Sequence, residues 1–180
     1  MFRDGYAYLH SRGNNANLGQ LLVEVAAARG CGLARAYSLL KGWGGELMNL
    51  EESFRIVREA AALGCCYAQD MLGWCFSCGK GVDQDKAEAV EWYKKAAEQG
   101  YAPAQCNLGF MYFKGYGVDE DKTEAVKWYK LAAEQGHARG QFNLGSMYDN
   151  GYGVDENKTE ALKWFKLAAV QGNAEGQCNL

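Results

Sequence analysis

Residues 104–112 read Ala-Gln-Cys-Asn-Leu-Gly-Phe-Met-Tyr, and residues 121–136 read Asp-Lys-Thr-Glu-Ala-Val-Lys-Trp-Tyr-Lys-Leu-Ala-Ala-Glu-Gln-Gly. In both stretches the apolar residues recur three or four positions apart, which is the spacing of one face of an α-helix. Asp121 with Glu124 three residues later is a capping-box pattern, so the second helix is expected to begin there. The glycines within residues 115–118 favour a helix end between the two stretches. The sequence therefore predicts a helical hairpin.

The hairpin recurs along the chain at a constant step. Residues 103–138 and 139–174 are identical at 25 of 36 positions, and Asn157 with Glu160 repeats the capping pattern. Because one hairpin cannot bury both of its apolar faces, neighbouring hairpins are expected to stack on each other. The residues that keep the step include Gly64, Gly100, Gly136 and Gly172, and Gln69, Gln105, Gln141 and Gln177.

The repeat weakens toward the N-terminus and is cut short at the other end. We expect a degenerate N-terminal repeat or cap over 1–30, a degenerate repeat over 31–66, regular repeats over 67–102, 103–138 and 139–174, and the truncated start of a further repeat over 175–180. Atypical first repeats are usual in such arrays, since one of their faces meets solvent. The half-helix at the C-terminus favours a fragment of a longer array, with coverage by another chain as the alternative.

The combined motif is Ala-Gln-x-Asn-Leu-Gly-x-Met-Tyr, then Gly-Tyr-Gly-Val, then Lys-x-x-Ala-x-x-Trp-Tyr-x-x-Ala-Ala-x-x-Gly. It resembles the Sel1-like repeat, a relative of the tetratricopeptide repeat, strongly over 67–180 and weakly over 1–66. The resemblance implies an all-α fold, a right-handed α/α superhelical solenoid of about four helical hairpins plus a partial fifth unit. It also implies an adaptor role in multiprotein assemblies.

The resemblance implies a binding face as well, because first helices line the concave side of tetratricopeptide-like folds. The partner-binding residues expected on this concave face are Asp70, Met71, Trp74, Ser77, Cys106, Asn107, Phe110, Lys114, Phe142, Asn143, Ser146 and Asn150. Asn107, Asn143 and Asn179 share one repeat position, and their amides could hold a peptide backbone or cap backbone groups inside the solenoid. The aromatic residues Trp74, Phe110 and Phe142 are binding anchors or inter-repeat packing.

A second aromatic series is expected in the core. Trp92, Trp128 and Trp164 stand at helical spacing within runs of small residues. If they are buried, replacing Trp128 with Ala costs about 3–5 kcal/mol through the cavity it leaves.

The seven cysteines do not follow the repeat, and their number is odd, so reduced thiols are expected rather than regular disulfides. Cys75 and Cys78 form a Cys-x-x-Cys pair, which supplies only two of the ligands that zinc needs. Cys75 stands where the next two repeats have Met111 and Met147, a slot that a small apolar side chain can fill. Packing is therefore preferred, with metal binding and redox chemistry as alternatives.

The sequence gives little support for a catalytic, phosphate-binding or calcium-binding site. Ser38 with Lys41 and Ser77 with Lys80 match Ser-x-x-Lys, but the companion elements of serine acyl-enzymes are missing. The Gly-Tyr-Gly-Val loop lacks the Gly-Lys-Ser/Thr of a phosphate loop, and the acidic residues after it lack EF-hand spacing. We expect no enzyme activity, no catalytic residue, no metal and no cofactor.

Charge and hydropathy limit the partners. The net charge is −3 and the lysines alternate with carboxylates, so no basic stripe for nucleic acid emerges. No apolar run reaches the length of a membrane span, and no signal peptide is visible at the N-terminus. The expectation is a soluble, intracellular protein of the cytoplasm or an organelle interior.

The predicted function is a non-catalytic scaffold or adaptor that binds a peptide or a folded protein partner on its concave face. The alternative is an architectural subunit of a large multiprotein assembly, docked mainly through its edges and ends.

Overall fold

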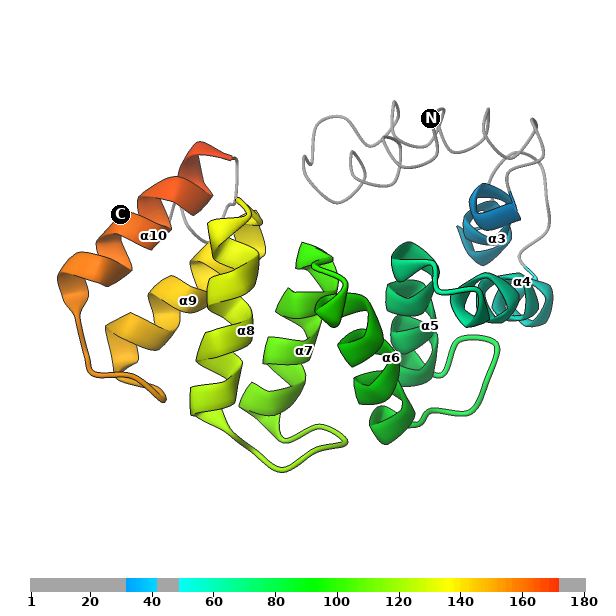
Figure 1. Ribbon diagram of the computed structural model, residues 1–180, viewed down its shortest axis with the longest axis horizontal. Coiled ribbons are helices and arrows are strands. Elements are labelled where there is room, and N and C mark those ends of the chain that lie inside the picture. Colours follow the sequence, from blue (N-terminus) through cyan, green and yellow to red (C-terminus); the bar gives the residue numbers. More distant parts are fainter. Residues whose placement is uncertain (1–31, 42–48, 172–180) are drawn as a thin grey trace. The chain divides into compact units, whose positions relative to one another are not determined.

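The computed structural model describes residues 32–41 and 49–171, and every regular element within these ranges is an α-helix (Figure 1). The helices are α3 (Gly32–Lys41), α4 (Leu50–Ala62), α5 (Cys66–Cys78), α6 (Lys86–Glu98), α7 (Ala102–Lys114), α8 (Lys122–Glu134), α9 (Ala138–Asn150) and α10 (Lys158–Val170). The predicted all-α class is confirmed. The segments predicted over 1–30 and 175–180 lie outside the described residues. None of the described helices is long and apolar enough to cross a bilayer.

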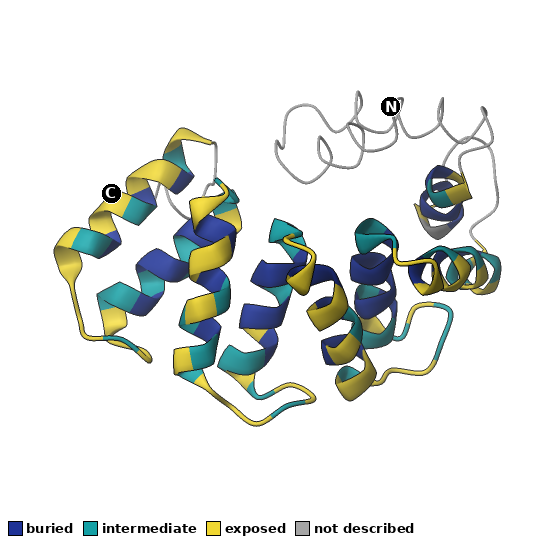
Figure 2. Cartoon of the chain, viewed as in Figure 1, coloured by how far each residue is buried: buried dark blue, intermediate teal, exposed yellow. Residues whose placement is uncertain are grey.

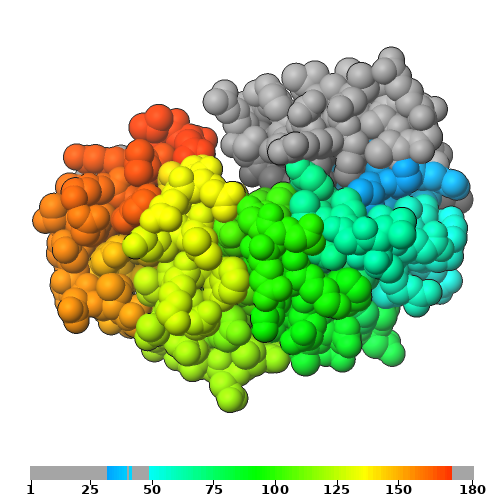
Figure 3. Space-filling model, viewed as in Figure 1, coloured from blue at the N-terminus to red at the C-terminus, as the bar shows by residue number. Residues whose placement is uncertain are grey.

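The chain divides after Asp85 into two compact units. The first contains α3, α4 and α5, and the second contains α6 to α10. In the space-filling view, the atoms of α6 to α10 form one continuous body, coloured from green to orange (Figure 3).

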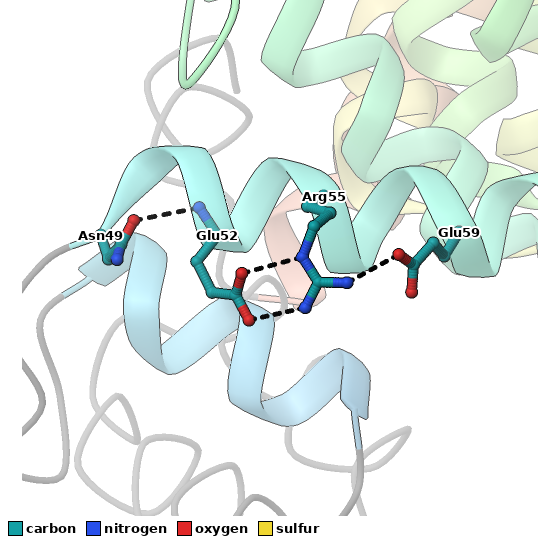
Figure 4. A network of polar contacts seen from close by, with 4 residues as sticks. All are labelled: Asn49, Glu52, Arg55 and Glu59. Atoms are coloured by element: carbon teal, nitrogen blue, oxygen red, sulfur yellow. Dashed lines mark hydrogen bonds and ion pairs between the residues drawn. The ribbon is translucent and has the colours of Figure 1, made fainter.

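In the first unit, α4 packs against both α3 and α5. The helix begins at Asn49, whose side chain accepts a 3.0 Å hydrogen bond from the backbone N–H of Glu52. On its solvent side Arg55 bridges Glu52 and Glu59, at 2.8 and 2.7 Å (Figure 4). Hydrogen bonding to Arg55 lowers the pKa of Glu52. Such exposed pairs add little stability, so burial of α4 on its neighbours supplies most of it.

In the second unit, α7 packs on α8 and α9 packs on α10, and α8 joins the two hairpins by packing on α9. In the two predicted capping boxes, the N-cap side chain accepts the expected hydrogen bond from the backbone. Asp121 accepts from the N–H of Glu124 at 2.9 Å, and Asn157 accepts from that of Glu160 at 3.0 Å. These caps satisfy N–H groups that have no partner within the helix.

The core of the second unit lies where each helix faces its neighbours, shown dark blue in Figure 2. One cluster of buried residues there comprises Cys106, Ala125, Tyr129, Ala132, Ala133, Leu144 and Met147. Alanines predominate among the buried residues of the second helices: three of the four buried residues of α8 are alanines.

The prediction that Trp92, Trp128 and Trp164 fill the core is wrong by one position along each helix. Trp92, Trp128 and Trp164 are half-buried, whereas the next residue of each helix, such as Tyr129, is buried. The reason lies in the first helix of the hairpin. A β-carbon at Gly109 would lie 2.8 Å from Cδ1 of Tyr129, so the missing side chain makes room for the tyrosine ring. Gly145 receives Phe165 in the same way.

Buried glutamines connect successive repeats. The side-chain N–H of Gln105 donates to the carbonyl of Ala97 at 3.2 Å, and that of Gln141 donates to Ala133, also at 3.2 Å. Gln141 in turn accepts from Gln171 at 2.8 Å. Each amide therefore joins its own hairpin to the preceding second helix, which explains why glutamine keeps the repeat step.

The loop after each first helix rests on the preceding second helix. At Gly117, where φ is +72°, a β-carbon would lie 2.2 Å from the carbonyl carbon of Lys86. Only glycine allows both this approach and this backbone conformation. The neighbouring Tyr116 ring lies 3.7 Å from Nζ of Lys86, within the range of a cation–π contact. Tyr152 and Lys122 repeat the pairing at 4.9 Å.

Candidate partner-binding face

The second unit carries eight of the predicted contact residues, all on α7 and α9. Seven of them are exposed or half-buried: Asn107, Phe110, Lys114, Phe142, Asn143, Ser146 and Asn150. Cys106 is buried in the core. Phe142 is half-buried, and its ring lies 5.6 Å from that of Phe165 on α10. This contact lies within the hairpin of α9 and α10, whereas the alternative expected for Phe142 was packing between repeats.

The first unit carries the other four, on α5. Asp70 and Met71 are buried, while Trp74 and Ser77 are half-buried. Asp70, Met71 and Cys106 are buried, so they offer almost no surface to a binding partner. The prediction of these three residues as surface contacts is therefore wrong. The physical reason is helix rotation: residues one position apart point about 100° apart, and these three turn inward. Ser77 is also out of step, because 36 residues later the chain has Phe113.

The two described asparagines of the repeat form hydrogen bonds with side chains of the neighbouring repeat. The side-chain oxygen of Asn107 accepts a hydrogen bond from Nη2 of Arg139. The side-chain N–H of Asn143 donates to Sγ of Cys106 at 3.6 Å. Nε of Arg139 donates to the same sulfur at 3.3 Å. A polar cluster of side chains thus spans the boundary between α7 and α9.

Arg139 is the surface residue that sequence reasoning missed. It is exposed at the start of α9, and it reaches across to α7. The equivalent positions of other repeats carry Tyr67, Pro103 and Glu175, so the repeat itself does not require an arginine. This departure from the repeat was the feature of the sequence that could have identified Arg139.

Phe110 is the exposed aromatic residue of this surface, at 41% of its full accessibility. Its ring meets that of Tyr116 edge to face, with 6.0 Å between the centroids. By contrast, Ser146 and Asn150 bond to backbone carbonyls of their own helix, at 3.1 and 2.9 Å. We call Asn107, Phe110, Lys114, Arg139, Asn143, Ser146 and Asn150 the first-helix face.

Of the cysteine pair of α5, Cys75 has a packing role, whereas Cys78 is exposed. Cys75 is 1% exposed and fills the predicted core slot. Burial raises the pKa of its thiol from 9.0 to about 12, with a smaller contribution from Cys78. Within residues 32–41 and 49–171, no group of three or more His, Cys, Asp or Glu side chains is placed to hold a metal ion. The first-helix face combines an aromatic ring, cations and amides.

Comparison with known proteins identifies the repeat. The family model of the Sel1 repeat matches residues 25–65, 66–101, 102–137 and 138–173. A protective antigen of uropathogenic Escherichia coli strains, which displays an SLR fold, is 40% identical with a TM-score of 0.77. A Sel1 repeat protein from Oxalobacter formigenes is 34% identical with a TM-score of 0.73. No curated protein sequence matches the chain.

Coverage of these two structures is unequal. The alignments span 87% and 82% of this chain, but 34% of the antigen and 60% of the Oxalobacter protein. The chain therefore spans less than two thirds of either relative. Helicobacter pylori cysteine rich protein B covers 73% of this chain and 98% of its own length, with a TM-score of 0.62. At 20% identity it supports the fold alone. Together these structures confirm the predicted class, an all-α solenoid of helical hairpins.

Proposed function

Because the chain belongs to the Sel1 repeat family, whose members generally mediate protein–protein interactions, we propose that it is a non-catalytic scaffold that binds a protein partner on its first-helix face. The partner would be an extended peptide or a surface segment of a folded protein. Presentation of this segment to other components would be the adaptor role.

The observation that carries this proposal is the contrast between repeated and non-repeated residues. Gly109, Gln141 and Tyr129 belong to positions that recur, and each has a packing role inside the unit. Phe110 and Arg139 do not recur, and both lie at the surface. Residues that the fold does not need, placed where a partner can touch them, are the expected mark of a binding face.

Photo-crosslinking tests the proposal. A crosslinking side chain would replace Asn150 on the first-helix face or, as the matched control, the exposed Lys130 on α8. In the native cell, the position 150 variant should form a covalent adduct with a partner and the position 130 variant should not. Adducts formed only from position 130 would contradict the proposal.

A second candidate function is the architectural one, in which the chain is a subunit of a large assembly docked through its second helices and ends. Exposed leucines favour it. Leu131 on α8 and Leu162 and Leu167 on α10 are 43%, 40% and 49% exposed, and Leu131 and Leu167 occupy the same repeat position. Apolar side chains repeated on an outer surface are a feature of contact sites. The control position of the crosslinking experiment lies beside Leu131, so adducts there would favour this second function.

A further inference from the structure

We propose that the loops after α7 and α9 form a second interaction surface of the second unit, which binds a basic segment of a partner protein through Tyr116, Asp119, Tyr152 and Asp155. We call these four residues the loop surface. The inference goes beyond the proposed function, because the first-helix face shares none of them. Two arginines of the partner segment, three residues apart, would each meet one tyrosine and one aspartate.

The loop surface presents the same pair of residues in two successive hairpins. Tyr116 and Asp119 lie between α7 and α8, and Tyr152 and Asp155 occupy the equivalent places between α9 and α10. Figure 1 shows the two loops at the same end of the helices of the second unit. The two tyrosines are 39% and 40% exposed. A partner can therefore touch equivalent groups in two neighbouring repeats.

Both tyrosine rings already attract ammonium groups within the fold. Nζ of Lys86 lies 3.7 Å from the centroid of the Tyr116 ring, and Nζ of Lys122 lies 4.9 Å from that of Tyr152. Each ring also contacts a phenylalanine of α7, with 6.0 and 5.9 Å between the centroids, which limits its rotation. The face of an aromatic ring attracts cations, and a guanidinium can also stack on it. The exposed part of each ring therefore suits an arginine of a partner.

Asp119 and Asp155 supply the negative charge beside these rings. Both are exposed, and neither forms an ion pair within the part of the chain that the structure describes. The acidic residues that follow them are different, because Glu120 and Glu156 pair with the lysines at the start of the next helices, each at 3.2 Å. The two aspartates are thus open to the forked N–H donors of a guanidinium.

The charge around the loop surface is negative as a whole. Residues 115–122 and 151–158 contain five acidic residues and two lysines. The flanking Asp149 brings the acidic residues to six, and Lys114 and Lys86 bring the lysines to four. Complementarity of charge therefore favours a basic partner over an acidic one.

The step between the repeats sets the spacing of the two arginines. Because α7 and α9 contact each other and packed helices lie about 8–10 Å apart, equivalent residues of the two loops are about 10 Å apart. In the polyproline II conformation, which unfolded segments adopt readily, residues three apart point to the same side and are about 9 Å apart. An Arg-x-x-Arg segment therefore fits the two tyrosine and aspartate pairs.

The test uses fluorescent short peptides with blocked ends, a fixed Arg-x-x-Arg core and mixed Gly, Ser and Ala at the other positions. In the matched pool both arginines are replaced by citrulline, which keeps the shape and removes the charge. Fluorescence anisotropy with the full chain in about 0.15 M salt should show at least about tenfold tighter binding of the arginine pool. Equal binding of the two pools, or binding of neither, would overturn the inference.

A pair of aspartate substitutions ties the effect to the loop surface. The double variant Asp119→Asn, Asp155→Asn should lose the preference for arginine over citrulline. The double variant Glu91→Gln, Glu98→Gln makes the same charge change at exposed positions of α6 and should keep it. Preference kept by the aspartate variant, or lost by the glutamate variant, would show that the peptide responds to net charge or binds elsewhere, and the inference would be wrong.

A third double variant tests the rings. Tyr116→Leu with Tyr152→Leu keeps apolar side chains but removes the aromatic faces, so it should weaken the arginine pool by at least about threefold. Circular dichroism and a melting curve for each variant separate loss of binding from loss of folding. Unchanged affinity in a folded tyrosine variant would contradict the assignment of these rings to the site.

Discussion

The ring of Tyr129 packs on the bare backbone of Gly109, since a β-carbon there would lie 2.8 Å from the ring. In an ordinary helix interior, Gly→Ala stabilises by about 0.5–1 kcal/mol. Here the added methyl group overpacks the hairpin, at a cost of about 1–3 kcal/mol. We expect Gly109→Ala to lower the free energy of unfolding in urea by about 1–2 kcal/mol.

The Tyr129→Leu background provides the control for this prediction. There the ring is gone and only the 3.2 Å approach to the carbonyl oxygen of Ala125 remains, so Gly109→Ala should destabilise less than it does in the wild-type background. A gain of stability from Gly109→Ala in the wild-type background would show that the close approach is absent.

Adjacent aromatic residues of α8 should differ in their contribution to stability. Tyr129 is buried and Trp128 is half-buried. Tyr129→Ala should cost about 3–5 kcal/mol, and Trp128→Ala less than half of that, because the cavity penalty applies to buried atoms. Thermal unfolding of the two variants shows which substitution costs more stability. A larger loss for Trp128→Ala would restore the tryptophan register expected from sequence alone.

The buried amide of Gln141 should be needed as a hydrogen-bonding group and not only for its volume. Gln141→Leu keeps the approximate size but removes the bonds to Ala133 and Gln171. We expect a loss of about 1–3 kcal/mol in urea unfolding. In a double-mutant cycle with Gln171→Leu, the two losses should not add. Simple additivity would mean that the two glutamines do not interact.

Two of the three thiols of α5, those of Cys75 and Cys78, should react very differently. With a pKa of about 12, Cys75 is thiolate to only about one part in ten thousand at pH 8. Iodoacetamide should therefore label the exposed Cys78 and spare Cys75 in the folded chain, as read by peptide mass spectrometry. Rapid native labelling of Cys75 would contradict its burial.

The raised pKa of Cys75 also makes the stability of the folded chain depend on pH. In the unfolded chain Cys75 ionises at its ordinary value of 9.0, and in the folded chain only near 12. The neutral thiol's contribution to stability is therefore complete below about pH 9 and is lost as the pH rises toward 12. A Cys75→Ala variant should show a weaker decline of stability over this window.

The fold could be predicted from sequence because the residues that build the hairpins recur. Asp121, Asn157 and the loop glycines occupy the places that their chemistry predicts. Rotation about each helix axis was less predictable. Trp128 and Tyr129 are both aromatic and adjacent, so apolar periodicity alone does not decide which one faces Gly109.

The face was harder to predict than the fold for the same reason. Cys106 and Asn107 are neighbours in sequence, yet one is buried and the other reaches the surface. Arg139 was missed because its role depends on a contact with the preceding repeat, 32 residues away. Repeated residues such as Gly109 and Gln141 report packing within the array, and packing gives no signal for residues that vary between repeats, such as Arg139.

The most direct measurement of the central claim is the affinity of the crosslinked partner for two matched triple variants. One removes Phe110, Lys114 and Asn150 from the first-helix face, and the other removes the exposed Leu131, Leu162 and Leu167, each by alanine. We predict that the first variant binds at least about tenfold more weakly and that the second binds as the wild type does. Loss of affinity in the leucine variant alone would contradict the first-helix face as the binding surface.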